Sequence, residues 1–150
     1  CPMLHVLFVC EHNSARSQMA ESFLKHLGNG DFRVESCGLE AGTVNPLVIE
    51  AMGEIGHDLR GATTQTALDL LKQGRRYDLV ITVCSRKASD LCPPFPGRSL
   101  RLNWPFTDPS TLEGDRESQL KEIRVIRDEI RRQVETFLAE YRVKGLTMFL

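Results

Sequence analysis

The sequence lacks any apolar stretch that approaches the roughly 18 residues needed to cross a membrane. The apolar run at 6–9 is also far too short for the core of a secretory signal peptide. No sign of charge predominates, because the 150 residues carry a formal net charge of -1. Neither nucleic acids nor acidic membranes are therefore expected as partners.

The cysteine count is odd, with Cys1, Cys10, Cys37, Cys84 and Cys92. In a chain without secretory features, an odd count argues against a framework of structural disulfides and for reactive or buried thiols in a reducing cytoplasm. There is no internal repeat and no low-complexity linker, so we expect one domain over residues 1–150. The chain begins Cys-Pro-Met, which leaves a further segment upstream open.

Short apolar runs alternate with segments of helical periodicity. Strands are expected at 4–9, 32–37, 77–84 and 99–104, and helices at 14–27, 46–55, 65–73 and 117–141. This alternation predicts an α/β fold, with a small parallel sheet covered by helices on both faces.

Residues 9–18, VCEHNSARSQ, place Cys10 at the end of the first strand and a polar loop directly before the first helix. In open α/β sheets, ligands bind at such strand ends, and the unpaired N–H groups of a helix N-terminus attract anions. Asn13 tolerates the left-handed backbone that turns successive N–H groups inward, and Ser14 and Ser17 are suitable caps. Arg16 adds a planar fork that matches two oxygens of a tetrahedral oxyanion.

The positive helix end and Arg16 also favour the thiolate form of Cys10, which is the nucleophilic form. The alternative is a buried strand-end cysteine before an ordinary helix. Cys-x5-Arg alone is a frequent chance pattern, so the place of this pattern between strand and helix is what favours a reactive site.

Three segments carry a family resemblance: CEHNSARSQMAESF from Cys10, SCGLEAG from Ser36, and WPFTDP from Trp104. In order and over almost the whole chain, the sequence resembles the low-molecular-weight tyrosine phosphatase superfamily, and within it the arsenate reductases. The resemblance implies a flavodoxin-like four-stranded parallel sheet flanked by helices. It also implies reduction of arsenate to arsenite by a cysteine thiol cascade.

The resemblance assigns roles to individual residues. Cys10 is the nucleophile, Ser17 hydrogen-bonds its thiolate, Asn13 holds the loop and Asp108 is the general acid. The oxyanion is bound by the loop Glu11, His12, Asn13, Ser14, Ala15, Arg16 and Ser17. An acid at position 11 is unhelpful beside an anion unless its side chain points away. The alternative for Asp108 is an Asp-Pro surface turn.

Cys84 closes a strand, so it is expected at the same sheet edge as Cys10, and Cys92 follows after seven intervening residues. In the family pattern Cys84 resolves the arsenic adduct of Cys10, and a Cys84–Cys92 disulfide ends the cascade. Eight helical steps of about 1.5 Å would separate the two Cα atoms by roughly 12 Å, whereas a disulfide needs about 4.4–6.8 Å. The segment is therefore either irregular or unwinds on oxidation. The alternative is that both cysteines are small hydrophobic core residues.

The resemblance implies thioredoxin or glutaredoxin as the reductant and no cofactor. It also points to a potassium site at Asn13, Glu21 and Ser36, but Gln65 replaces the fourth, acidic position, which predicts a weak site or none. One alternative function is a low-molecular-weight protein tyrosine phosphatase hydrolysing phosphomonoesters, although Ser110 and Thr111 stand where phosphatases carry an aromatic residue. A non-catalytic oxyanion-sensing domain of a longer chain is the other.

Overall fold

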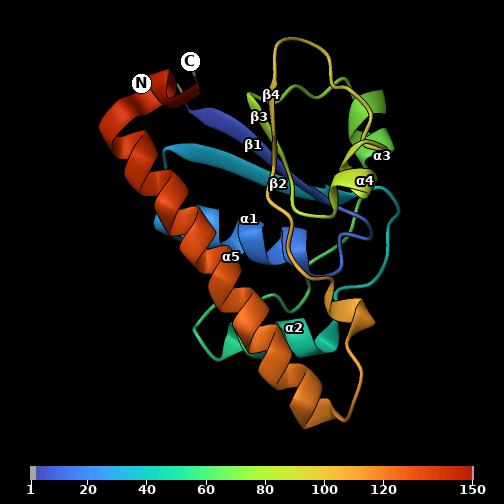
Figure 1. The fold of residues 1–150 in the computed structure, drawn as a ribbon. Coiled ribbons are helices and arrows are strands. Elements are labelled where there is room, and N and C mark those ends of the chain that lie inside the picture. The colour runs from blue at the N-terminus through green and yellow to red at the C-terminus, as the bar shows by residue number, and fades with distance from the viewer. Residues whose placement is uncertain (1–2, 150) are drawn as a thin grey trace.

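The computed structural model describes residues 3–149 and shows a parallel sheet with helices on both faces (Figure 1). The four strands, in the spatial order β2-β1-β3-β4, are β1 Leu4–Cys10, β2 Phe32–Gly38, β3 Leu79–Thr82 and β4 Leu100–Asn103. The α-helices are α1 Arg16–Leu27, α2 Pro46–Gly53, α3 Ala67–Lys72, α4 Arg86–Ser89 and α5 Arg116–Lys144, with short 3-10 helices η1 Pro109–Thr111 and η2 Gly145–Phe149. The predicted four-stranded parallel α/β fold is confirmed.

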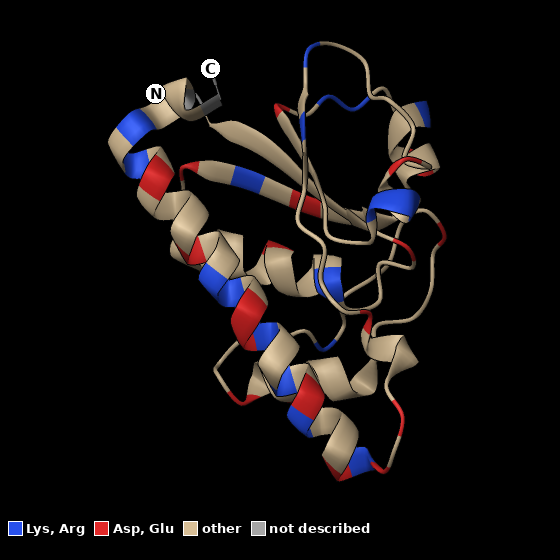
Figure 2. Ribbon diagram, viewed as in Figure 1, with Lys and Arg blue, Asp and Glu red and all other residues tan. Residues whose placement is uncertain are grey.

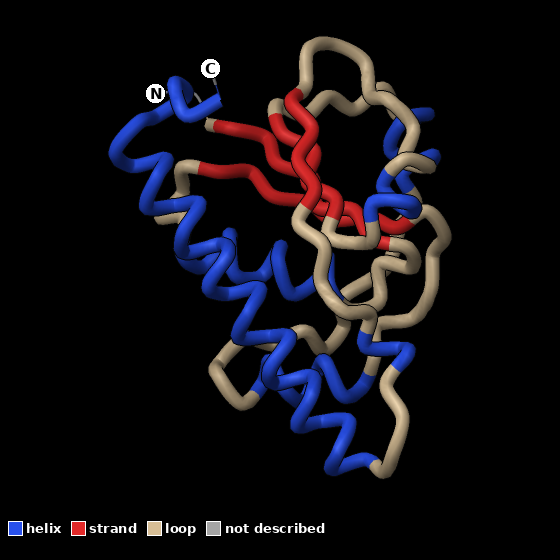
Figure 3. Tube along the Cα trace, in the orientation of Figure 1, coloured by secondary structure: helices blue, strands red, loops and turns tan. Residues whose placement is uncertain are grey.

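The two faces of the sheet are covered by different helices (Figures 1 and 3). Because side chains alternate along a strand, Val6 and Phe8 of β1 enter the larger apolar cluster, which is built with α1, α2 and α5. Leu7 and Val9 enter a smaller cluster with α3 and the loop before β4. A strand buried on both faces reads as a continuous apolar run, which explains the sequence of β1.

The start of α1 differs from the sequence expectation. The helix begins at Arg16, its N-cap is Ala15, and no side chain caps it, so the expected capping by Ser14 and Ser17 is wrong. The physical reason is that residues 11–15 form a tight loop, with Asn13 in the left-handed region at φ 55° as predicted. The first N–H groups of the helix are thereby left for another partner.

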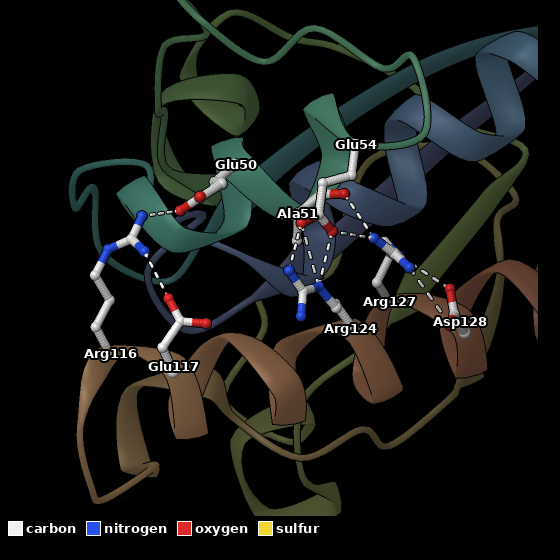
Figure 4. Close-up of polar contacts among 8 residues, drawn as sticks. All are labelled: Glu50, Ala51, Glu54, Arg116, Glu117, Arg124, Arg127 and Asp128. Carbon is white, nitrogen blue, oxygen red and sulfur yellow. Dashed lines mark hydrogen bonds and ion pairs between the residues drawn. The ribbon is translucent and has the colours of Figure 1, made fainter.

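The long helix α5 carries basic and acidic residues of both signs along its length (Figure 2). Its arginines dock α2, as Figure 4 shows. Arg124 contacts the Glu54 carboxylate at 2.6 Å, and Arg127 donates to Glu54 at 3.1 Å and to the Ala51 carbonyl at 2.7 Å. Arg116 pairs with Glu50 nearer the start of α5. In residues 3–149, no helix is both long and apolar enough to span a membrane.

Arg127 is expected to contribute most to this docking, because it is 8% exposed and satisfies a buried carbonyl. Arg127→Met keeps the apolar stem but removes these bonds, and should lower the free energy of unfolding by about 1–3 kcal/mol. The more exposed Arg116→Met is the matched control, and should cost no more than about 1 kcal/mol. Urea denaturation measures both, and equal losses would contradict this assignment.

The neighbouring histidines His26 and His57 should make the stability of the fold depend on pH. The His57 ring lies 4.1 Å from that of His26, and its Nδ1 is 2.8 Å from the Ser22 hydroxyl. Burial lowers the pKa of His57 below the ordinary 6.5, and His26 and Arg131 lower it further. Since the unfolded chain then binds the proton more tightly, stability should fall as the pH drops through 6.5. The urea midpoint should be lower at pH 5.5 than at 7.5, and this difference should shrink in His57→Gln. An unchanged difference would contradict the role of His57.

Candidate active site

A loop at the carboxyl end of β1 is fixed from outside by backbone hydrogen bonds. The carbonyls of Cys10, Glu11, His12 and Ser14 accept hydrogen bonds of 2.8–3.0 Å, in this order, from the N–H groups of Leu39, Glu40, Gly42 and Asn45. In a trans peptide the next N–H points opposite to the carbonyl, so the N–H groups of residues 11, 12, 13 and 15 face away from this supporting segment. Successive N–H groups arranged in this way form an anion-binding concavity.

Gly38 and Gly42 allow the supporting segment to lie this close. A Cβ atom on Gly38 would sit 2.4 Å from the Glu40 carbonyl oxygen and 2.6 Å from the Asn13 nitrogen. One on Gly42 would lie 3.2 Å from the His12 carbonyl oxygen. Backbone atoms cannot yield as flexible side chains do, so a side chain at position 38 is incompatible with this loop geometry.

Cys10 lies at this loop, and the residue is 2% exposed; its sulfur has two hydrogen-bonding neighbours. It accepts the Asn13 N–H at 3.1 Å and lies 2.9 Å from the Ser17 hydroxyl. The Asn13 side chain in turn donates to the hydroxyls of Ser17 and Ser36, at 2.8 and 3.0 Å. The sulfur is thus held inside the loop by two hydrogen-bonding neighbours, Asn13 and Ser17.

Arg16 and Asp108 are far apart in the sequence and lie close together in the structure. The Arg16 guanidinium is buried, donates to the Phe106 carbonyl at 3.1 Å, and approaches the Asp108 carboxylate at 3.6 Å. The other Asp108 oxygen accepts the Ser110 N–H at 2.9 Å and so starts η1. Asp108 therefore lies beside Arg16, at the helix end of the loop that begins at Cys10.

Cys84 lies beside Cys10 at the sheet edge. Thr82 of β3 is in register with Val9 of β1, which places Cys84 just past the level of Cys10. The Asn103 amide donates to the Cys84 carbonyl at 3.0 Å. Burial raises the pKa of the Cys84 thiol to about 11, although the nearby Arg16 acts in the opposite direction. Cys84 is thus a protonated thiol at rest.

Cys92 lies in a different environment from Cys84, and the short helix α4 separates the two in sequence. It packs in the smaller apolar cluster, whose members include Tyr77 and Phe95, and burial raises its pKa. Between the two cysteines lies α4, capped by Ser85, and the Cys92 N–H bonds to the Ser89 carbonyl at 3.1 Å. The segment is therefore only partly helical, because α4 covers Arg86–Ser89 alone and both cysteines lie outside it. All four cysteines within residues 3–149 are unbridged, and Cys1 lies outside the described residues.

A cavity of about 670 Å³ opens on the outer side of the loop. Glu11, His12, Glu40, Lys87 and Leu91 are among its lining residues. The His12 ring is 3.7 Å from the Glu40 carboxylate. Glu11 and His12 thus line a neighbouring cavity, so we assign them to the anion loop only through their backbone.

The expected potassium ligands Asn13, Glu21 and Ser36 lie together but do not fit a metal ion. Asn13 Oδ1 accepts the Gln65 N–H at 3.1 Å, and the Ser36 carbonyl accepts the Gln65 side-chain amide at 2.9 Å. Glu21 accepts one bond at each carboxylate oxygen, from Ser36 and from Lys25. The oxygens that a cation needs are already engaged. Elsewhere in residues 3–149, no group of three or more His, Cys, Asp or Glu side chains is arranged to hold a metal.

Sequence reasoning missed the task of the supporting segment, and it missed Lys25. SCGLEAG was singled out only as part of the family resemblance, and its two glycines are the signal of close backbone approach, because the N–H contacts themselves leave no mark in residue type. Lys25 could have been found, because it stands four positions after Glu21 on a helix, the spacing of an ion pair.

This geometry agrees with the comparisons. The pattern of the family described as "Low molecular weight phosphotyrosine protein phosphatase" matches residues 5–145, and the chain belongs to this family. Relatives include a protein named arsenate reductase from Halalkalibacterium halodurans, 41% identical over 88% of this chain and 93% of that protein. Another is a protein named glutaredoxin arsenate reductase from Synechocystis, 37% identical over 92% and 98%. A solved structure of an arsenate reductase in the oxidized state aligns with a TM-score of 0.76 at 34% identity, over 92% and 98% of the two chains.

Proposed function

We propose that this chain is a cytoplasmic enzyme that reduces arsenate to arsenite through Cys10, Cys84 and Cys92. The observation that carries the proposal is a second thiol, Cys84, beside a nucleophile that already sits in an anion-binding loop. A phosphatase needs one thiol and a water, whereas a two-electron reduction needs two thiols that end as a disulfide. The relatives named arsenate reductase support this choice.

In the first step, arsenate occupies the N–H groups of the loop and the Arg16 guanidinium. The anion competes with Asp108 for Arg16, since the two contacts use the same fork. The Cys10 thiolate attacks arsenic, an oxygen departs, and Asp108 supplies the proton that turns this oxygen into water. The product is a covalent Cys10–arsenic(V) adduct.

In the second step, the Cys84 sulfur attacks the Cys10 sulfur, forming an S–S bond and breaking the S–As bond. The electron pair of the broken bond stays on arsenic, which leaves as arsenite and takes up the Cys84 proton. Cys92 then attacks Cys84, releasing the Cys10 thiolate and giving the Cys84–Cys92 disulfide. Cys84 and Cys92 lie in different surroundings with α4 between them, so we expect the last step to draw Cys92 out of its apolar cluster and to rearrange the 84–92 segment.

A thioredoxin or glutaredoxin is the proposed reductant of that disulfide. A dithiol redox protein can reach the disulfide once the 84–92 segment has opened, and one relative is itself named for glutaredoxin. Turnover assays with each protein as the electron source decide between them.

The test begins with fully reduced protein and stoichiometric arsenate, followed by alkylation and mapping of all five cysteines by mass spectrometry. Released arsenite with a Cys84–Cys92 disulfide would support the proposal, and phosphate in place of arsenate is the control that should leave every thiol free. Five alkylated thiols with unchanged arsenate would overturn it. That outcome would leave the phosphatase or the oxyanion-sensing alternative.

A further inference from the structure

A continuous chain of hydrogen bonds runs from the surface of α1 to the Cys10 sulfur. Lys25 Nζ lies 2.6 Å from one oxygen of Glu21, and the other oxygen accepts the Ser36 hydroxyl at 2.5 Å. Ser36 is bonded to the Asn13 amide and Asn13 to Ser17, whose hydroxyl contacts sulfur. Nothing in the proposed reaction uses Lys25 or Glu21, although they end a chain that reaches the nucleophile.

The directions of the hydrogens in this chain are fixed at two points, Glu21 and Asn13. An ionised carboxylate only accepts hydrogen bonds, so Ser36 must give its single hydrogen to Glu21 and can then only accept from Asn13. The Asn13 amide orientation is fixed independently, because its oxygen accepts the Gln65 backbone N–H, a group that can only donate.

The same direction of hydrogen-bond donation continues to the Cys10 sulfur. Asn13 has two amide hydrogens and gives one to Ser36 and the other to Ser17. Because Ser17 accepts from Asn13, its own hydrogen is left for the Cys10 sulfur, 2.9 Å away. The sulfur thereby receives the Ser17 O–H in addition to the Asn13 N–H.

Lys25 holds the outer end of this chain. Its side chain is 51% exposed, whereas that of Glu21 is 21% exposed, so Lys25 lies at the surface and Glu21 lies further inside. The positive charge of the Lys25 ammonium neutralises the negative charge of Glu21, which is connected to the Cys10 sulfur by hydrogen bonds. Together with the two donors of Gln65, the ammonium occupies the oxygens that a potassium ion would need.

We propose that Glu21 and Lys25 are positioning residues for Cys10, and that the Lys25 ammonium and Gln65 take the place of a metal cation in this protein. The inference rests on the proposed function only in taking Cys10 as the nucleophile. It goes further in assigning a task to two residues that never touch the substrate.

The test is a double-mutant cycle read by the rate at which iodoacetamide alkylates Cys10 at pH 7. Lys25→Met should slow alkylation about 3- to 10-fold, the range expected when a hydrogen bond to a charged group is weakened. Lys25→Arg should restore the rate, and Lys121→Met, the same charge change on an exposed position of α5, should leave it unchanged. In a Ser17→Ala background, Lys25→Met should have no further effect, because the chain is already cut.

Equal slowing by Lys25→Met with and without Ser17 would overturn the inference, as would no slowing at all. Wild-type alkylation and urea midpoints should be the same in NaCl and KCl of equal ionic strength, and a potassium-specific change would overturn the metal-free assignment. Alkylation needs no arsenate. Arsenate left unreduced with the cycle as expected would therefore overturn only the proposed function.

Discussion

Cys84→Ser is expected to lower arsenate reduction at least about 1,000-fold, because a hydroxyl cannot resolve the Cys10–arsenic adduct as a thiol does. Hydrolysis of a small phosphomonoester, for which Cys10 and a water suffice, should change far less. The measurement is arsenite release and phosphate release by the same preparation. Cys84 is fully buried, and serine differs by one atom, so the fold should survive the change.

Cys37→Ala is the matched control for this experiment. Cys37 is also fully buried at the sheet, but it packs in the smaller apolar cluster with Cys92, and burial raises its pKa far above the ordinary value. A protonated thiol outside the route from Cys10 to Cys84 should be dispensable for reduction. Undiminished arsenite release by Cys84→Ser, or its loss in Cys37→Ala, would contradict the assigned cascade.

Gly38→Ala adds a single methyl group, and we expect it to damage both the stability of the fold and anion binding at the active-site loop. The added Cβ would lie 2.4–2.7 Å from backbone atoms of Glu40, Asn13 and His12, so the loop and its support must separate. Overpacking of this kind costs about 1–3 kcal/mol in stability. The lost loop geometry should also weaken phosphate binding at least about 100-fold, since N–H groups bind only when aimed at the anion. Calorimetric titration with phosphate and urea denaturation measure the two effects.

Gly53→Ala provides the comparison within the same chain. A Cβ on Gly53, at the end of α2, would meet nothing within 4 Å. Alanine also has the higher helix propensity, so this variant should be as stable as the wild type or slightly more so. If both variants bound phosphate equally well, close backbone approach would not be what shapes the loop.

The sequence predicted most where a functional residue lies at the end of a segment with a clear apolar pattern. The apolar run ending at Cys10 predicted β1 and placed the thiol, because a strand buried on both faces must be continuously apolar. It was least informative where a side chain has a competing partner that only folding brings near, and the capping prediction failed for this reason. Ser17 is a good cap in isolation, but its hydroxyl is taken by the Cys10 sulfur and the Asn13 amide.

The 84–92 segment shows a second limit. Spacing alone showed that a continuous helix over residues 84–92 and a Cys84–Cys92 disulfide exclude each other. It did not show that the resting chain has only the short helix α4 there, with both thiols free. That choice depends on packing: Cys92 gains a buried place beside Tyr77 and Phe95, and Arg101 fixes the chain there by donating to the carbonyls of Cys92 and Pro93. Tyr77 and Arg101 lie outside the segment, before and after it in the sequence, so no pattern within residues 84–92 encodes these contacts.

The backbone support of the active-site loop has a consequence for how the sequence can vary. Leu39, Glu40 and Asn45 hold the loop through their peptide N–H groups, which nearly every amino acid possesses. A substitution of the exposed Glu40 can therefore leave this support intact, except for proline, which has no N–H to give. Asn45 and Leu39 are more constrained, because Asn45 also caps α2 and Leu39 packs against the smaller apolar cluster. The cavity on the outer side of the loop, which Glu40 lines, can thus change its lining at this position while the loop beneath it keeps its shape.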